Sequence, residues 1–335
     1  MPRRRQALAV RAAGLLPTFV ARRLAGAAAE TGGGPIEPDL ALLLRLVERF
    51  RWPELERMSA AAAQAEARRE GAVLAGRRLR VRVRALELPG PAGPLAARLY
   101  EAGGDNLIVW LHGGGWVLDD LDSHDRLCRR FARTSGASVL AVDYRCAPAA
   151  RFPAAAGDAV AAVRWAHDHA AELGADPGRV GIGGDSAGGN LAAVTALALR
   201  DAVAFQVLLY PIADVSREHE SYAVFEHGPW LTAAQMRWFR AHYLTDATAA
   251  KDPRVSPLLA GDLAGAPPAY VGIAGVDPLR DEGVAYARRL EQAGNEVLLD
   301  VLPQQIHGYA TLAGVSRSAH AATLRAADWV RARHQ

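Results

Sequence analysis

The hydrophobic positions of this chain predict two amphipathic helices, followed by a long alternation of strands and helices. Residues 37–50 place apolar side chains such as Leu40 and Leu44 on one stripe of a helix, and a second helical pattern covers 54–70. Half-buried and buried strand patterns then follow, at 80–88, 95–100, 106–111, 138–144, 180–183, 205–210, 269–274 and 296–301. We therefore expect an α/β protein with an eight-stranded, mostly parallel sheet, an antiparallel start and helices on both faces.

The interval 214–266 interrupts this alternation because it has no strand pattern. Within it, Thr232 and Gln235 have the spacing of a capping box and predict the start of a helix. The apolar faces of this helix and of the N-terminal helices need a partner, which a helical cap over the site provides. The predicted division is a flexible basic segment at 1–34, cap helices at 35–75, a core at 76–213 and 267–335, and a cap insertion at 214–266.

A serine flanked by small residues follows the strand at 180–183. The run Gly184-Asp185-Ser186-Ala187-Gly188 lies between an apolar stretch and a helical pattern, which predicts a strand, a tight turn and a helix. Such a turn holds Ser186 in a strained conformation with its hydroxyl exposed, and a Cβ two positions to either side would collide with a neighbour. Ser186 is the candidate nucleophile. The alternative is a serine without a catalytic role in a glycine-rich turn.

A glycine triplet follows the strand at 106–111, in the run His112-Gly113-Gly114-Gly115-Trp116. Acyl transfer needs backbone N–H groups that can approach a developing oxyanion without interference from side chains. We expect the N–H groups of Gly113, Gly114 and Ala187 to form this oxyanion hole. His112 precedes the donors and is interpreted as a residue that fixes the loop by hydrogen bonding, not as a base.

A serine nucleophile also needs a general base and a group that orients the base. Asp277 and His307 each follow a predicted strand, so both should lie at the same sheet edge as Ser186. The chain order Ser, Asp, His is the order used by the α/β-hydrolase arrangement. Asp281 and Glu282 compete with Asp277, but they open the next predicted helix, where the helix dipole favours carboxylates. The remaining histidines lie in helical or charged surroundings and are interpreted as structural.

These motifs resemble a known family, the hormone-sensitive-lipase-like (family IV bacterial) esterases of the α/β-hydrolase superfamily, in the branch with Asp before the nucleophile. The resemblance spans residues 86–335 and is carried by His112-Gly-Gly-Gly, Val142-Asp-Tyr-Arg, Gly184-Asp-Ser-Ala-Gly-Gly, Asp277-Pro-Leu-Arg-Asp-Glu-Gly and His307-Gly-Tyr. It implies an α/β-hydrolase fold with a helical cap, and carboxylic ester hydrolysis without a cofactor or metal.

The chain departs from the family pattern at four positions, which affect pocket shape and local packing: Asp119, Cys146, Ala149 and Gln304. Candidates for the wall that binds the acyl or alcohol group are four apolar residues: Trp116, Phe225, Trp230 and Leu231. For each of them, a purely structural contact between cap and core is an equal alternative.

Composition and charge suit one large domain with an accessory element, since 335 residues are 50% hydrophobic and 22% charged. The first 24 residues contain six arginines and no acidic residue. Because the net charge of the whole chain is +3, the remaining residues carry a charge of about −3. This distribution argues against nucleic-acid recognition. Two cysteines, Cys128 and Cys146, do not form a disulfide framework and favour a reducing, cytoplasmic location.

The basic first 24 residues are interpreted as a frayed terminus, with a signal peptide, a membrane-surface segment or packing on the cap as alternatives. No run reaches the length of a transmembrane helix. The sequence thus predicts a serine carboxylesterase for short-to-medium acyl esters, and leaves a homodimer open. An amidase or lactonase with the same residues, a small-ligand receptor on this scaffold and a peptidase are the alternatives.

Overall fold

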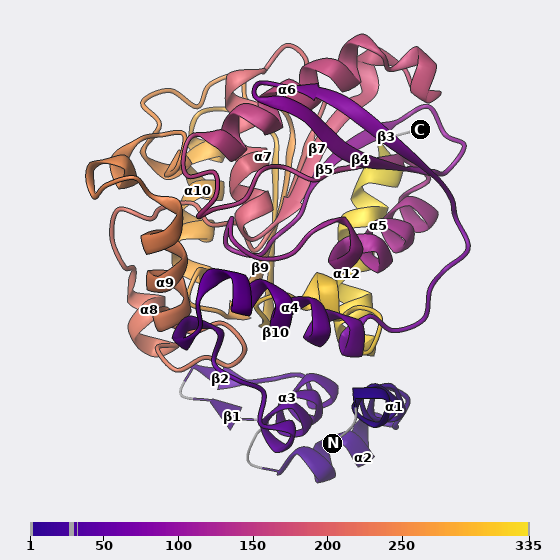
Figure 1. Ribbon diagram of the computed structural model, residues 1–335, viewed down its shortest axis with the longest axis vertical. Coiled ribbons are helices and arrows are strands. Elements are labelled where there is room, and N and C mark those ends of the chain that lie inside the picture. The colour runs from indigo at the N-terminus through magenta and orange to yellow at the C-terminus, as the bar shows by residue number, and fades with distance from the viewer. Residues whose placement is uncertain (1–2, 27–29, 32, 334–335) are drawn as a thin grey trace.

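The computed structural model describes residues 3–26, 30–31 and 33–333, which form a central sheet covered by helices (Figure 1). Eight strands pair in the order β10-β9-β8-β7-β5-β6-β4-β3, and β4 is antiparallel to both of its neighbours while the other pairs are parallel. The strands are β3 (Arg82–Gly90), β4 (Gly93–Glu101), β5 (Leu107–Leu111), β6 (Ser138–Val142), β7 (Val180–Asp185), β8 (Gln206–Leu209), β9 (Ala269–Val276) and β10 (Val297–Ile306). All eight predicted strands and the mostly parallel sheet are confirmed.

The sheet is buried on both faces because successive side chains of a strand point to opposite sides. In β5, Leu107, Val109 and Leu111 join one core cluster, whereas Ile108 and Trp110 join the other. The first cluster includes the helices α6 (Ala154–Asp168), α7 (Ala187–Ala198) and α10 (Arg280–Gln292), and the second includes α5 (Leu121–Ser135) and α12 (Arg317–Ala332). Three short helical segments connect the larger elements: η3 (Ala171–Leu173), η4 (Pro177–Arg179) and α11 (Tyr309–Leu312).

The two segments that the sequence predicts as a cap contain helices in the structure. The N-terminal part consists of α3 (Pro38–Phe50), η2 (Leu55–Arg57) and α4 (Ala60–Leu74), and the insertion of α8 (Glu220–Val224), α9 (Ala233–Tyr243), η5 (Thr248–Lys251) and η6 (Pro257–Leu259). The predicted capping box is present, because Thr232 Oγ1 accepts from Gln235 N and Gln235 Oε1 accepts from Thr232 N. The two parts meet where α9 contacts η2.

The prediction of a frayed N-terminal segment is wrong for most of its length. Residues 3–26 contain two helices, α1 (Arg3–Gly14) and α2 (Thr18–Ala25), which pack on α3, and α1 also contacts α4. Their small residues make this close packing possible, since Ala21 and Ala25 are almost fully buried. Arg3 pairs with Glu66 of α4, which ties the start of α1 to the cap. A short pair of strands follows, β1 (Glu30–Thr31) and β2 (Gly34–Pro35); residues 1–2, 27–29 and 32 of the predicted flexible segment lie outside the described residues.

None of the helices in the described part of the chain is both long enough and apolar enough to cross a bilayer.

Candidate active site

Ser186 stands at the junction of β7 and α7 in a strained backbone conformation, with φ 55° and ψ −117°. Its N–H donates to Leu209 O at 2.9 Å. A Cβ added to Gly184 would overlap the backbone of Gly188, and one added to Gly188 would overlap the carbonyl oxygen of Leu111. The turn therefore requires the small residues that its sequence contains, as predicted.

Ser186, His307 and Asp277 form one hydrogen-bonded row, although they are far apart in the sequence. His307 Nε2 lies 2.9 Å from Ser186 Oγ, and His307 Nδ1 lies 2.7 Å from Asp277 Oδ2. The second carboxylate oxygen, Asp277 Oδ1, accepts from Leu279 N at 2.9 Å, which fixes the orientation of the carboxylate. All three side chains are largely buried, since Ser186 and His307 are each 7% exposed and Asp277 is 1% exposed. They meet because β7, β9 and β10 are parallel and end at the same edge of the sheet.

The competing carboxylates Asp281 and Glu282 have other partners. Asp281 Oδ2 accepts from Ser221 N at 2.8 Å, and Ser221 Oγ in turn donates to Pro278 O, so α8 is hydrogen-bonded to the loop after Asp277. Glu282 Oε1 accepts from the backbone of 213–214, and burial raises the pKa of Glu282 well above its usual value. Neither residue hydrogen-bonds to His307.

The glycine loop presents its N–H groups differently from the sequence prediction. The N–H of Gly113 points at His124 Nε2, 3.3 Å away, so the prediction of Gly113 as an oxyanion donor is not supported. By contrast, the N–H groups of Gly114, Gly115 and Ala187 make no hydrogen bond within the described residues. Gly114 and Gly115 have φ of 101° and 61°, a region that favours glycine. These glycines turn the loop so that successive N–H groups point in different directions.

His112 fixes its own loop, as predicted. Its Nδ1 donates to Gly113 O at 2.8 Å, and its ring stacks on Tyr144 with centroids 4.2 Å apart. The Tyr144 hydroxyl donates to His112 O at 2.8 Å. Burial, reinforced by the nearby His124, lowers the pKa of His112 to about 4, so this imidazole is neutral at ordinary pH.

His124 was interpreted as structural from the sequence, but it contacts two parts of the site. Its Nε2 lies 3.1 Å from Oδ1 of Asp185, the residue before Ser186, and its Nδ1 lies 2.9 Å from Ser123 Oγ. Burial alone would lower the pKa of His124 and raise that of Asp185, but their mutual attraction prevails, so the pKa of His124 is raised and that of Asp185 is lowered. The signal in the sequence is a histidine at i+3 from Leu121, on the apolar stripe of α5.

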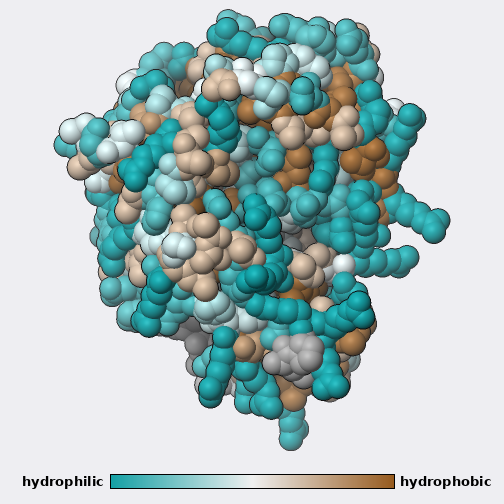
Figure 2. Space-filling view, viewed as in Figure 1, coloured by the Kyte–Doolittle hydropathy of each residue, from teal (hydrophilic) through white to brown (hydrophobic). Residues whose placement is uncertain are grey.

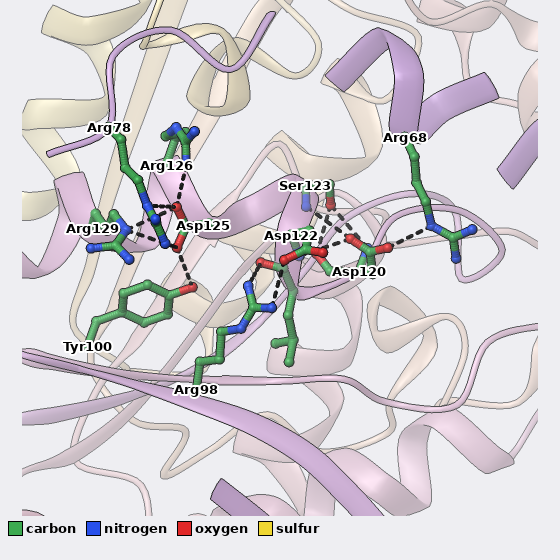
Figure 3. Close-up of polar contacts among 11 residues, drawn as sticks. Arg68, Arg78, Arg98, Tyr100, Asp120, Asp122, Ser123, Asp125, Arg126 and Arg129 are labelled. Carbon is green, nitrogen blue, oxygen red and sulfur yellow. Dashed lines mark hydrogen bonds and ion pairs between the residues drawn. The ribbon is translucent and has the colours of Figure 1, made fainter. Parts of the chain in front are cut away.

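The start of α5 is held by charged contacts on both sides of His124 (Figure 3). Asp120 forms a capping box with Ser123 and accepts from Arg68 of the cap helix α4 at 2.8 Å. Asp125 is a buried carboxylate surrounded by donors from four residues: Arg78, Tyr100, Arg126 and Arg129. Burial alone would raise the pKa of Asp125, but Arg129 and Arg78 lower it. These contacts fix the helix turn that carries His124.

The predicted pocket residues occupy two kinds of position. Trp116, Phe225 and Leu231 are almost fully buried, and Trp116 stacks on Tyr243 of α9 with centroids 4.3 Å apart, which favours the structural alternative for them. Trp230 is half-buried and lies against the residue that follows His307, because a Cβ on Gly308 would be 3.0 Å from Trp230 Nε1.

Two aromatic neighbours of the site had no predicted role. The ring of Phe239 in α9 lies directly on Gly115, since a Cβ there would overlap it. The ring of Tyr210 packs edge-on against His307 with centroids 4.8 Å apart. Met236 and Phe239 lie three residues apart on the buried face of α9, but such periodicity in a sequence does not say what the face covers.

A serine, an imidazole and a carboxylate in one row, beside unpaired backbone N–H groups, suit nucleophilic acyl transfer. Within residues 3–26, 30–31 and 33–333, no three His, Cys, Asp or Glu side chains are grouped as a metal site requires.

Comparisons with known proteins agree with this chemistry. A family model described as the alpha/beta hydrolase fold matches residues 108–311. The chain is 43% identical over 312 residues to the carboxylic ester hydrolase LipN of Mycobacterium tuberculosis, covering 89% of this chain and 83% of that protein. It is 39% identical to the ethyl acetate hydrolase of Pseudomonas putida, covering 85% of this chain and 95% of that protein. A hyperthermophilic esterase from Pyrobaculum calidifontis superposes with a TM-score of 0.85 at 35% identity, covering 89% of this chain and 99% of the other. The chain therefore belongs to the α/β-hydrolase fold family, as a carboxylic ester hydrolase of its hormone-sensitive-lipase-like branch.

Proposed function

We propose that this enzyme hydrolyses short-to-medium acyl esters with Ser186 as nucleophile, His307 as general base and acid, and Asp277 as the group that orients His307. The observation that carries the proposal is the hydrogen-bonded row, with 2.9 Å between Ser186 Oγ and His307 Nε2 and 2.7 Å between His307 Nδ1 and Asp277 Oδ2. Both distances are suited to proton transfer and to fixing the tautomer of the imidazole.

In the first half-reaction, Ser186 Oγ attacks the ester carbonyl carbon while His307 Nε2 takes the hydroxyl proton. Asp277 keeps the Nδ1 proton of His307 in place and stabilises the imidazolium. The tetrahedral intermediate then collapses, and His307 gives its proton to the departing alcohol. In the second half-reaction, His307 removes a proton from water, which attacks the acyl-enzyme and releases the carboxylic acid and free Ser186.

The negative charge that develops on the carbonyl oxygen needs N–H donors that are free to point at it. We assign this role to the N–H groups of Gly114, Gly115 and Ala187, in place of the Gly113 N–H that points at His124. Ala187 N is also the first N–H of α7, so the positive end of the helix dipole supports the same charge. Loss of one donor in such a site typically costs about 10²-fold to 10³-fold in kcat.

The preference for small acyl groups rests on the cover over the nucleophile. Ser186 is 7% exposed, and the Phe239 ring of the insertion lies on Gly115. We propose that the helices of 35–75 and 214–266 act as a cap that limits substrate size. The name of the Pseudomonas putida relative, an ethyl acetate hydrolase, is consistent with a small ester.

Hydrolysis of p-nitrophenyl esters from acetyl to palmitoyl tests the proposal, with Ser186→Ala run in parallel. Turnover should peak at short or medium chains and fall about 10⁴-fold or more in the variant. The matched control is Ser59→Ala, which removes an exposed helix-capping serine at the start of α4 and should leave turnover unchanged. A folded Ser186→Ala protein that keeps most of its activity would contradict the nucleophile. Amides and lactones belong in the same panel, because higher kcat/KM on either would move the function to an amidase or lactonase.

A further inference from the structure

The two N-terminal helices expose more large apolar side chains than any other stretch of similar length in the described chain. Leu8, Leu15 and Phe19 are 66%, 79% and 76% exposed, and Leu24 is 47% exposed. The other exposed large apolar residues of the described chain are each below 47% and lie elsewhere: Val224, Leu259, Leu298 and Val301. A concentration of this kind marks an interaction surface.

The arrangement within the helices is the reverse of ordinary amphipathic packing. In α2 the buried residues are Ala21 and Ala25, whereas the large Phe19 faces outward. In α1 the buried face carries Gln6, Val10 and Ala13, and Leu8 lies on the opposite side by helical geometry. The buried faces of the two helices therefore contain neither leucine nor phenylalanine, and the large Leu8 and Phe19 are left available to a partner.

Positive charge flanks these apolar side chains. Residues 3–26 contain six arginines and no acidic residue. Arg4 and Arg11 stand at i−4 and i+3 from Leu8, and Arg22 and Arg23 follow Phe19 by one helical turn. Within the described residues Arg4, Arg5, Arg22 and Arg23 form no ion pair, whereas Arg3 pairs with Glu66.

The position of the helices leaves this surface accessible. In Figure 1, α1, α2 and α3 lie together at the lower end of the molecule, beyond the cap helix α4. The same view in Figure 2 shows hydrophobic and hydrophilic atoms side by side at this end.

We propose that the outer side of α1 and α2 docks on the surface of an anionic lipid bilayer. We call this surface the α1–α2 face, and its residues are Arg4, Arg5, Leu8, Leu15, Phe19, Arg22, Arg23 and Leu24; Arg11 instead donates to Gly76 O. The apolar side chains enter the boundary between headgroups and acyl chains, and the guanidinium groups pair with anionic headgroups. The helices lie in the interface plane and do not span the bilayer.

The chemistry of the α1–α2 face favours lipid over the other partners that a basic surface can attract. A nucleic acid would pair with the arginines but would leave the exposed leucines and phenylalanine in water. A second copy of the chain, docked through the same face, would bring the arginines of one face against the same arginines of the other without an acid between them. A bilayer surface with anionic headgroups satisfies both the charges and the apolar side chains.

Flotation of the full chain with lipid vesicles tests the proposal. We expect binding to mixed phosphatidylcholine and phosphatidylglycerol vesicles, and at least tenfold weaker binding to phosphatidylcholine alone. Leu8→Ser combined with Phe19→Ser should weaken binding to the mixed vesicles at least tenfold, and each of Arg22→Gln and Arg23→Gln about fivefold. The matched control is Leu298→Ser with Val301→Ser, which removes two exposed apolar side chains of β10 and should bind like the wild type.

Hydrolysis of a short soluble ester verifies that each variant is folded, since none of these residues lies in the site. Equal binding of the wild type to both vesicle types, or unchanged binding of the Leu8→Ser and Phe19→Ser variant, would overturn the proposal. A wild-type dimer in light scattering that this variant converts to a monomer, without vesicle binding by either, would assign the α1–α2 face to self-association.

Discussion

His124 Nε2 lies 3.1 Å from Asp185 Oδ1, and Asp185 is the residue directly before Ser186. Both side chains are almost fully buried, and the Gly113 N–H points at the same imidazole nitrogen. One buried imidazole thus hydrogen-bonds the start of α5 to the turn of Ser186 and lies against the glycine loop. The glycine loop supplies two of the proposed oxyanion donors, and the turn of Ser186 supplies the proposed nucleophile. The position of the loop relative to the turn therefore depends on His124.

Replacing His124 should therefore lower turnover more than it lowers substrate binding. For His124→Gln we expect kcat to fall roughly 10-fold to 10²-fold with KM nearly unchanged, because the donors are displaced from the position of the oxyanion. Steady-state kinetics on p-nitrophenyl acetate measures both constants, and His167→Gln, a surface histidine of α6, is the control.

The unfolding free energy of His124→Gln is a second, independent measurement. Removal of one partner from a buried ion pair leaves an uncompensated charge, so His124→Gln should lose about 3 kcal/mol of unfolding free energy. Adding Asp185→Asn removes that charge and should restore part of the loss. A fall in stability with unchanged kcat would show that His124 is structural and does not position the catalytic groups.

Asp277→Asn tests the orienting carboxylate. The variant keeps an oxygen for the Leu279 N–H, but its amide nitrogen faces His307 and favours the wrong imidazole tautomer. We expect kcat to fall about 10⁴-fold with little change in fold. Asp281→Asn is the matched control, because Asp281 bonds to Ser221 and Arg280 instead, and its kcat should stay within about threefold. Equal losses in the two variants would argue against the specific role of Asp277.

The contact between Gly115 and Phe239 makes a prediction about substrate size. Gly115→Ala places a methyl group in the Phe239 ring at a φ of 61°, so we expect a loss of about 10²-fold in kcat/KM. Phe239→Ala alone should shift the preferred acyl chain to longer esters, because the ring no longer fills the space above the glycine loop. The double variant should recover part of the activity lost in Gly115→Ala.

Gly136→Ala is a control that introduces backbone strain at a positive φ without a steric clash. Gly136 ends α5 with φ 77° and has no atom within 4 Å of an added Cβ. This control should lose about 1 kcal/mol of stability and keep its kcat/KM. If the double variant is as inactive as Gly115→Ala, the strain and not the Phe239 ring explains the loss.

The parts of the fold that the sequence predicted well are those in which local pattern and topology agree. The buried runs of β5 to β9 are dominated by apolar residues bounded by turns, and parallel pairing then places the residues after each strand at one edge. The sequence could place Ser186, Asp277 and His307, the proposed catalytic residues, at one edge because each directly follows a strand, so no knowledge of side-chain packing was needed.

The parts that the sequence did not predict depend on packing between distant elements. Helices α1 and α2 were missed because their leucines and Phe19 face outward, whereas alanines, Val10 and the polar Gln6 are buried, which inverts the usual pattern. The direction of the Gly113 N–H depends on φ values of its neighbours that three identical glycines do not encode. His124 was dismissed because its partner, Asp185, lies 61 residues away.

Glu70, in the cap helix α4, makes stability depend on pH. Burial, reinforced by the neighbouring Glu66 carboxylate, raises the pKa of Glu70 from 4.5 to about 8, although Arg3 opposes the shift. Between these two values the folded state holds a proton that the unfolded state has released, so the free energy of unfolding falls as the pH rises from about 4.5 to 8. Glu70→Gln removes this dependence.

The variant should therefore match the wild type near pH 5 and exceed its unfolding free energy by about 2 kcal/mol near pH 8, after allowance for solvent screening. Urea unfolding of both proteins at about pH 5, 6.5 and 8 measures the difference in their unfolding free energies. All other titratable groups are the same in both proteins, so their contributions cancel in this difference. Glu172→Gln, at an exposed carboxyl group, is the control and should track the wild type at every pH. Parallel curves for Glu70→Gln and the wild type would mean that Glu70 is ionised in the folded protein and that the cap accommodates its charge.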